Sequence, residues 1–218
     1  QRVEILKGPS SALYGSDGLA GAIAYTTKDA SDLASSNNPY LSSTVSFDDS
    51  TDSTKVGLLG AFVRDNVEGL IQVTHRDTHE RNLHNQANIE PNSMSGESNS
   101  VLAKLKFLLN ESFDLTFTAD IQEWKNDWDL STETGFSFFP TPTQTSSALG
   151  TDESSRHRYS IELGFNNSNM FFDEGRITAF AQKTEQDQIT NKSKLIFEMG
   201  MRARPTPYSE YQNFQFNQ

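Results

Sequence analysis

The sequence predicts an all-β protein: about seven or eight antiparallel strands that form part of a larger transmembrane, up-and-down β-barrel. Three observations lead to this prediction. Apolar and polar residues alternate from Leu41 onward, which is the period of a β-strand. The alternating segments are about 9–13 residues long, close to the length that a tilted strand needs to cross a bilayer. Short and long connections also follow one another along the chain, as in outer-membrane barrels.

The clearest strand lies at 113–124. Every second residue from Phe113 to Ile121 is apolar, and the residues between them are Asp or Thr. The segment that begins at Tyr159 repeats this pattern, and the segment that begins at Leu41 is a third clear case. The other segments alternate less regularly. The predicted strands are 40–48, 55–64, 68–76, 99–109, 113–124, 154–166 and 175–184, with an eighth beginning near Phe214 and Phe216.

The connections between these strands fall into two groups. The links at 65–67 and 110–112 are tight, and the link at 167–174 is of moderate length. The long polar stretches are 77–98, 125–153 and the run after Thr184. Tight turns at one end and long loops at the other are typical of an outer-membrane barrel, in which the long loops face outward. A soluble β-sandwich with long hairpins is the alternative interpretation of the same strands.

Charged residues lie on the opposite face of the predicted strands from the apolar stripe. If the apolar stripe faces lipid, these residues line a lumen, and the lumen must hold something polar. If it faces a soluble core, they are solvated. The charged residues at mid-strand are Lys104, Lys106, Asp114, Asp120, Arg156, Arg158 and Glu162.

Composition excludes several functional classes. The net charge is −11, so a nucleic acid is not expected as a partner, because phosphates require a basic surface. The chain has no cysteine, which excludes disulfides and thiolate metal sites. Aromatic residues make up 11% of the chain, more than a disordered protein would carry. No arrangement of acid, base or nucleophile indicates catalysis, so we expect a protein that is not an enzyme, with no bound cofactor and no metal site. Strand-like sequence at both ends predicts a fragment of a longer protein.

The first 28 residues differ in character from everything that follows. A short strand, "RVEIL", leads into a turn rich in glycine and serine, and a second apolar run ends in Thr27 and Lys28. Proline suits the start of a short helical turn, and glycines permit positive φ and close backbone approach. A phosphate-binding loop is a weak alternative for "GSDGLAG", because the Gly-Lys-Ser/Thr ending is missing.

This segment, "RVEILKGPSSALYGSDGLAGAIAYTTK" at 2–28, closely resembles the end of the plug domain of TonB-dependent outer-membrane receptors. The resemblance covers about one eighth of the chain, and a first barrel strand follows at the expected distance. The residues of the structural plug motif are Lys7, Gly8, Pro9, Ser10, Ser11, Tyr14, Gly15, Gly18 and Gly21. The resemblance implies three parts of the chain: the C-terminal part of an α+β plug domain at 1–30, a linker at 31–39, and the N-terminal part of a barrel at 40–218.

The resemblance also implies a function and a location. Receptors of this family lie in the outer membrane of Gram-negative bacteria and import a ligand that binds to the outer loops and the plug. The expected partners are a TonB-type energising protein in the periplasm and outer-membrane lipid, including lipopolysaccharide. The acidic loops are either solvated surface or sites where divalent ions bridge lipopolysaccharide.

Two stretches resemble the haem and haemoglobin receptor branch of this family. "YTTKDASDL" at 25–33 matches the run that follows the plug, and "THRDTHERNLHN" at 74–85 resembles a strand and outer loop more loosely, since Asp77 and Thr78 replace the usual residues. Haem, free or carried by haemoglobin, is therefore the expected ligand, with His79 and His84 as candidate contacts on the outer loop. A ferric-siderophore or cobalamin receptor and a passive adhesin remain the alternatives.

Other residues near the loops have competing interpretations. His75 lies in register with the apolar stripe, and His157 lies near the outer end of its strand, so neither is favoured as a ligand over His79 and His84. All four are equally compatible with ordinary polar residues. The long loop at 125–153 carries Phe136, Phe138 and Phe139, which predict either a protein-contact surface or a self-packed loop core.

Overall fold

The computed structural model describes residues 2–8, 21–82, 92–166, 174–197 and 204–217. These residues form an all-β protein in which the only helical elements are two short 3-10 turns, η1 (Ala30–Asp32) and η2 (Ser131–Glu133). In the described ranges, neither turn has the length and apolar character that a membrane-spanning helix requires.

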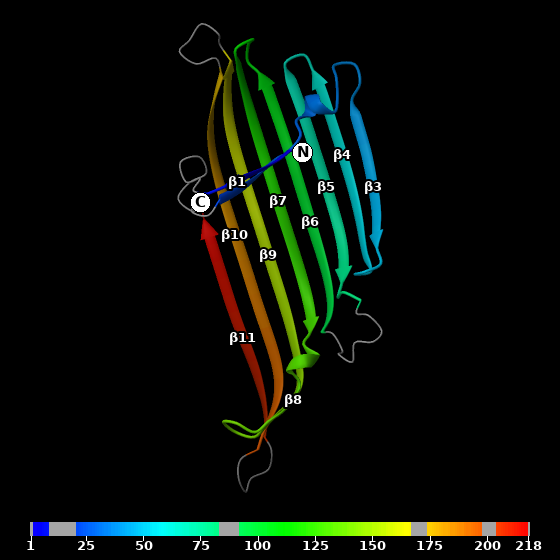
Figure 1. The fold of residues 1–218 in the computed structure, drawn as a ribbon, viewed down its shortest axis with the longest axis vertical. Coiled ribbons are helices and arrows are strands. Elements are labelled where there is room, and N and C mark those ends of the chain that lie inside the picture. The colour runs from blue at the N-terminus through cyan, green and yellow to red at the C-terminus, as the bar shows by residue number, and fades with distance from the viewer. Residues whose placement is uncertain (1, 9–20, 83–91, 167–173, 198–203, 218) are drawn as a thin grey trace.

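The main element is one long antiparallel sheet, in which each strand follows its neighbour along the chain (Figure 1). Its path is β11-β10-β9-β7-β6-β5-β4-β3, and the short β8 (Gly135–Ser137) pairs with β9. The strands are β3 (Tyr40–Asp48), β4 (Ser53–Arg64), β5 (Val67–His79), β6 (Ser93–Leu108), β7 (Phe113–Asp129), β9 (Thr143–Asn166), β10 (Glu174–Ile196) and β11 (Arg204–Asn217). This confirms the predicted up-and-down antiparallel order and an eighth strand, although β11 begins at Arg204 and not near Phe214. The sheet is curved but not closed, with β3 and β11 at its edges.

The strands are much longer than the sequence predicts. β6 has 16 residues, β7 has 17, β9 has 24 and β10 has 23. The predicted long loops at 77–98 and 125–153 and after Thr184 are therefore wrong over much of their length. Strand continues to His79 and resumes at Ser93, and it continues again to Asp129 and Ile196. These extensions carry polar residues on both faces, so alternation of apolar residues does not reveal them.

One face of the sheet carries a continuous apolar surface at the end where the short turns lie. Cross-strand pairing places its residues in level rows, such as the middle row of Phe62, Gly69, Leu105, Phe117, Ile161 and Ala179. We call these rows the apolar belt; they run from the row of Phe113 and Phe165 to the row of Val101 and Ile121. No element packs over the belt in the described part of the chain, and Phe117 and Ile161 are 42% and 41% exposed.

The other face of the sheet is polar at the same level. The register places all seven predicted mid-strand charges on it, which confirms their separation from the apolar stripe. Several of them form ion pairs across neighbouring strands. The pairs are Arg156–Asp120 at 2.8 Å, Arg176–Glu162 at 3.0 Å and Lys106–Asp114 at 3.8 Å.

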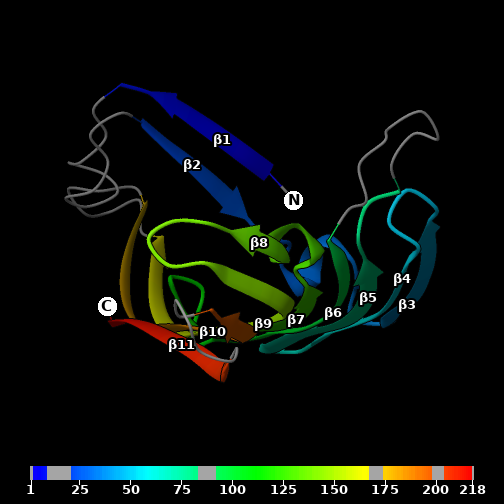
Figure 2. The same cartoon turned by 90° about the horizontal axis from the view of Figure 1, so that it is seen from below.

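The beginning of the chain lies on this polar face. β1 (Arg2–Lys7) and β2 (Gly21–Thr26) form a separate two-stranded antiparallel sheet, which confirms the two strands predicted at the front of the chain. Figure 2 shows this hairpin and η1 on the concave side of the main sheet. The polar face is therefore the concave face, and the apolar belt is on the convex face.

The link after β2 packs directly on the concave face. Ala30 and Ala34 are buried together with Ala61 of β4 and Leu70 of β5, and Leu102 of β6 packs against this cluster. Leu102 breaks the apolar alternation of its strand because it points to the concave side, under the link. We call residues 27–34 the linker segment; it spans the predicted end of the plug domain and the first part of the linker predicted at 31–39, and it connects the hairpin to the main sheet, which we call the wall.

Candidate functional site

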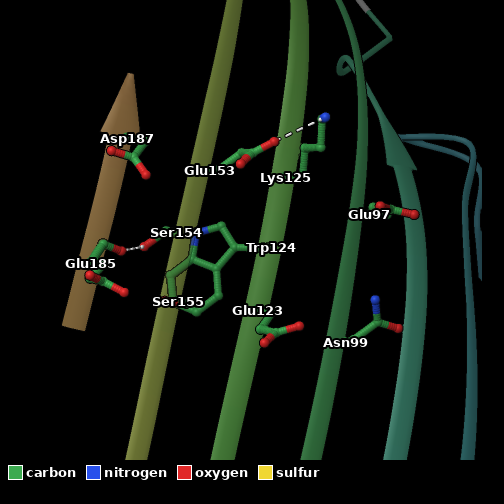
Figure 3. Close-up of a pocket in the computed structure, with 10 residues that line it drawn as sticks. All are labelled: Glu97, Asn99, Glu123, Trp124, Lys125, Glu153, Ser154, Ser155, Glu185 and Asp187. Atoms are coloured by element: carbon green, nitrogen blue, oxygen red, sulfur yellow. Dashed lines mark hydrogen bonds and ion pairs between the residues drawn. The ribbon is translucent and has the colours of Figure 1, made fainter. Parts of the chain in front are cut away.

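The loop-end half of the convex face is strongly acidic. Immediately beyond the apolar belt, the next two rows of β5, β6, β7, β9 and β10 carry six carboxylates among other polar side chains. We call this group the acidic collar; its members are Asp77, Glu97, Glu123, Glu153, Glu185 and Asp187. Five of them line an open depression of about 270 Å³, together with Asn99, Trp124 and Lys125 (Figure 3).

Lys125 is the cation at the centre of this depression. Its Nζ lies 3.0 Å from Glu153 Oε1, and Figure 3 shows the two side chains reaching toward each other from β7 and β9. The hydrogen bond and the charge of Glu153 raise the pKa of Lys125 above its ordinary value. In the same depression, Ser154 Oγ donates to the Glu185 carbonyl at 3.3 Å. The collar is thus an exposed, partly neutralised ionic surface.

The chemistry available to the collar is that of a solvated anionic surface. Within the described ranges, no three His, Asp or Glu side chains converge closely enough to hold a metal ion. The carboxylates are spread over five strands, β5, β6, β7, β9 and β10.

His79 is exposed at the last position of β5. Its backbone N–H donates to the Thr51 carbonyl at 3.0 Å, which ties the end of β5 to the turn between β3 and β4. The side chain lines a second open depression beside Asp77, Ser95 and Asp127. His84, the other candidate haem contact, lies outside the described residues, so the joint action of the two histidines stays a prediction.

The other two histidines are engaged by neighbouring polar groups. His75 is on the convex face, as its register predicts, with Nδ1 2.7 Å from Asn99 Oδ1 and Nε2 3.2 Å from Asp77. His157 Nε2 lies 3.1 Å from Glu123 Oε1. These contacts hold both imidazoles against the sheet surface.

Glu80 fixes the start of the loop that follows His79. Its Oε2 accepts a hydrogen bond from the Met94 backbone N–H at 2.9 Å, and its own N–H donates to the Met94 carbonyl at 3.0 Å. The Met94 N–H is the main reason that the pKa of Glu80 lies below its ordinary value. The loop carrying His84 therefore begins from a fixed base.

The aromatic residues of the loop between β7 and β9 form a small exposed cluster. Phe136 packs edge-on against Phe138, with ring centroids 4.7 Å apart, and lies 5.7 Å from Phe197 beyond β10. Phe138 and Phe139 remain 79% and 87% exposed. The loop therefore combines both predicted interpretations: Phe136 belongs to a local packed group, while Phe138 and Phe139 present apolar surface at the loop end.

The predicted plug motif is described only at its two ends. Lys7 is exposed at the end of β1, and Gly8 follows it with φ of +104°. Gly21 begins β2, where a Cβ would lie 2.5 Å from the Leu6 carbonyl oxygen, so no larger residue fits without a shift of the backbone. The remaining motif positions, Pro9, Ser10, Ser11, Tyr14, Gly15 and Gly18, lie outside the described residues.

The contact between the linker segment and the wall was not predicted. Lys104 was expected only to line the concave face, yet its Nζ lies 2.9 Å from Asp29 Oδ1. The one sequence signal for this contact is the apolar residue Leu102, which interrupts the polar face of its strand.

Compared with protein-family models, the chain matches none of them, and no match is found among the curated proteins. The function is therefore argued from the residues and their geometry.

Proposed function

We propose that this chain is part of a TonB-dependent outer-membrane receptor that imports haem, free or from haemoglobin. In this proposal the main sheet is a section of the barrel wall, and the β1–β2 hairpin is the end of the plug domain. The single observation that carries the proposal is the position of the linker segment. The segment that resembles the end of a plug continues into residues fixed on the polar, concave face of a sheet whose convex face is apolar.

The apolar belt supports the membrane location. A soluble sheet must cover such a face, whereas a membrane barrel leaves it open to acyl chains. Among the described convex residues of the belt, two carry a formal charge. They are Arg64, at the turn end of β4, and Lys183, in the last row. Beyond that row the acidic collar begins, as expected where the wall leaves the hydrocarbon.

The choice of haem rests on weaker support than the receptor class. It depends on the resemblance of 25–33 and 74–85 to the haem branch, and on the exposed imidazole of His79 at the loop end. A neutral imidazole is a common axial ligand of haem iron. A ferric-siderophore or cobalamin receptor is the second candidate, and a passive adhesin is the third.

Growth of cells on haem tests the proposed import. The full-length protein is produced in a Gram-negative host that cannot synthesise haem, with haemin as the only haem source. We expect growth that requires both this protein and a functional TonB protein. Growth that continues without TonB would contradict energised import, and lack of growth would favour one of the two other candidates.

Absorption spectroscopy tests the ligand directly. Purified full-length protein is titrated with haemin, and a Soret band of bound haem is expected. The variants His79→Ala and His84→Ala should each weaken this band, whereas His157→Ala, on the sheet surface, serves as the matched control. No spectral change with either haemin or haemoglobin would exclude haem and favour a siderophore or cobalamin ligand.

A further inference from the structure

The ammonium group of Lys104 contacts the linker segment at three points. Nζ lies 3.4 Å from the Thr27 carbonyl oxygen, 3.2 Å from the Lys28 carbonyl oxygen and 2.9 Å from Asp29 Oδ1. An ammonium group has three N–H donors, so these three acceptors match its full capacity. The Lys104 side chain is only 15% exposed, whereas that of Asp29 is 53% exposed, so the ammonium group is held mainly on the protein side of a half-exposed ion pair.

The residues that follow are held by apolar packing and by a local turn. Ala30 and Ala34 are 4% and 9% exposed in the cluster with Ala61 and Leu70. The N–H groups of Leu33 and Ala34 donate to the Ala30 carbonyl at 3.0 and 2.8 Å. Asp29 is oriented by its own backbone N–H, which donates to Asp32 Oδ2 at 2.8 Å. The linker segment is therefore fixed to the wall by polar contacts at its start and apolar contacts at its end.

The hairpin before the linker segment is attached differently. β1 and β2 form their own sheet, with no hydrogen-bonded strand partner in the main sheet among the described residues. Figure 2 shows the hairpin extending away from the wall across the concave side. The contacts of Lys104 with the chain after β2 begin at the Thr27 carbonyl, the first residue of the linker segment.

We propose that Lys104 is a positioning residue that anchors the linker segment to the wall, so that plug movement during import is confined to the residues before Thr27. The inference rests on the proposed receptor function, because only a receptor of that kind moves its plug. A force applied to the plug then ends at the Lys104 contacts, and the buried cluster of Ala30, Ala34, Ala61 and Leu70 stays in place.

Hydrogen exchange tests the anchor without any ligand. In the full-length protein in lipid nanodiscs, exchange of the Leu33 and Ala34 amides is compared between wild type and Lys104→Met. Methionine keeps much of the length of the side chain but removes every donor, so exchange should accelerate about tenfold or more. Lys104→Arg should restore part of the protection. Lys106→Met is the matched control, since Lys106 is on the same face and pairs with Asp114 instead. Unchanged exchange in Lys104→Met would overturn the anchor.

A cross-link tests whether the linker segment stays in place during import. Leu33 and Leu102 line one cavity between the linker and the wall, and these 218 residues contain no cysteine, so Leu33→Cys with Leu102→Cys gives the one thiol pair within them. Full-length protein carrying this pair is closed with a short bismaleimide in cells, and uptake of haemin is measured. Uptake should remain within about twofold of each single-cysteine variant.

The possible outcomes separate the anchor from the proposed function. Uptake that stops in the cross-linked double variant, while both single variants still import haemin, would overturn the inference. If the wild-type protein itself does not import haemin, the proposed ligand fails, and the exchange measurement then decides the anchor alone. Faster amide exchange in Lys104→Met, together with continued haemin uptake after cross-linking, supports both the anchor and the proposed function.

Discussion

The same strands contain two regions that differ in the contrast between their faces. In the half near the short turns, the convex face is apolar and the concave face is polar. In the half near the loops, both faces are polar, although the hydrogen-bonded ladder continues without a break from Leu163 to Glu153 on β9. The stability of the turn-end half depends on what covers the apolar belt. The second half must be stabilised by contacts between its own side chains.

Cross-strand contacts supply this stabilisation in the loop-end half. Trp128 Nε1 donates to Asp152 Oδ2 at 2.9 Å on one face. Thr151 Oγ1 donates to Asp127 Oδ1 at 2.8 Å on the other face. Such pairs contribute modestly each, but they occur along the whole length of a ladder. One long strand can therefore be stabilised by burial of an apolar face at one end and by cross-strand polar contacts at the other.

A cation placed in the apolar belt should cause the largest loss of stability. Ile161 lies in the middle row, so Ile161→Arg should destabilise the full-length protein in lipid by about 4 kcal/mol, the upper end for a cation at mid-membrane. The neighbouring Ser160→Arg, which points to the polar concave face, should change stability far less. The measurement is equilibrium unfolding from lipid vesicles. Equal losses in the two variants would mean that the convex face does not meet lipid.

An arginine placed in the loop-end half tests whether the two regions differ as described. Thr151 lies on the convex face of β9, like Ile161, but beyond the acidic collar. Thr151→Arg removes one hydrogen bond to Asp127 while placing a cation beside acidic neighbours. The unfolding free energy should change by less than about 1 kcal/mol. A loss as large as that of Ile161→Arg would contradict the boundary between the two regions.

The next effect compares the buried and exposed apolar residues of the turn-end half. Leu70 is 5% exposed under the linker segment, and Leu41 is 83% exposed on the convex face. Leu70→Ala should cost about 2 kcal/mol, at the low end for a buried leucine because the adjoining cavity allows relaxation. Leu41→Ala should cost clearly less in the same unfolding experiment. The reverse order would show that the linker cluster does not stabilise the wall.

A smaller effect concerns the polar contacts of the loop-end half. Asp152→Ala removes the acceptor of the Trp128 indole N–H and should destabilise this part of the sheet by about 1 kcal/mol. Amide exchange in the outer parts of β7 and β9 measures this local loss. Asp152→Asn retains an acceptor oxygen and should behave almost as wild type. If Asp152→Ala exchanges no faster, backbone pairing alone maintains the strands there.

The smallest effect is a pH dependence at the base of the loop after β5. The pKa of Glu80 is lowered in the folded protein by the Met94 N–H, so its ionised form adds stability above the unfolded pKa. That stability is lost as the pH falls through the folded pKa, which lies below 4.5. A spin label at Ser95→Cys should become more mobile over this acidic range. Glu80→Gln should remove the pH dependence, and a mobility change that persists in Glu80→Gln would assign it to another group.

The sequence predicts the strands well in the turn-end half and poorly in the loop-end half. The segments from Phe113 to Ile121 and from Tyr159 to Phe165 were predicted as strands with the correct inward and outward faces. Alternation is detectable there because one face is apolar and the other is polar. Residues 143–153 and 185–196 have no such contrast, so their strand structure comes from pairing with neighbours that a single sequence does not identify.

The candidate site could be predicted in part. His79 was expected on the outer loop and lies instead at the last position of β5, and the charges of the concave face were assigned from their register. The acidic collar was not predicted, because Glu97 and Glu153 lie far apart in the chain and meet only through the register of β6, β7 and β9. The Lys104 anchor escaped prediction for the same reason, since it joins residues about 75 positions apart.

The order of the strands has a consequence for how the sheet is assembled. Each strand of the path pairs with the one before it, apart from the small β8, so every completed hairpin offers a free ladder on which the next strand can form. β3 lies at one edge of the path, so its outer side has no strand partner among the described residues. β3 has nine residues, the fewest of the eight strands, and four of them are serine or threonine. A short edge strand rich in serine and threonine limits wrong pairing with other molecules.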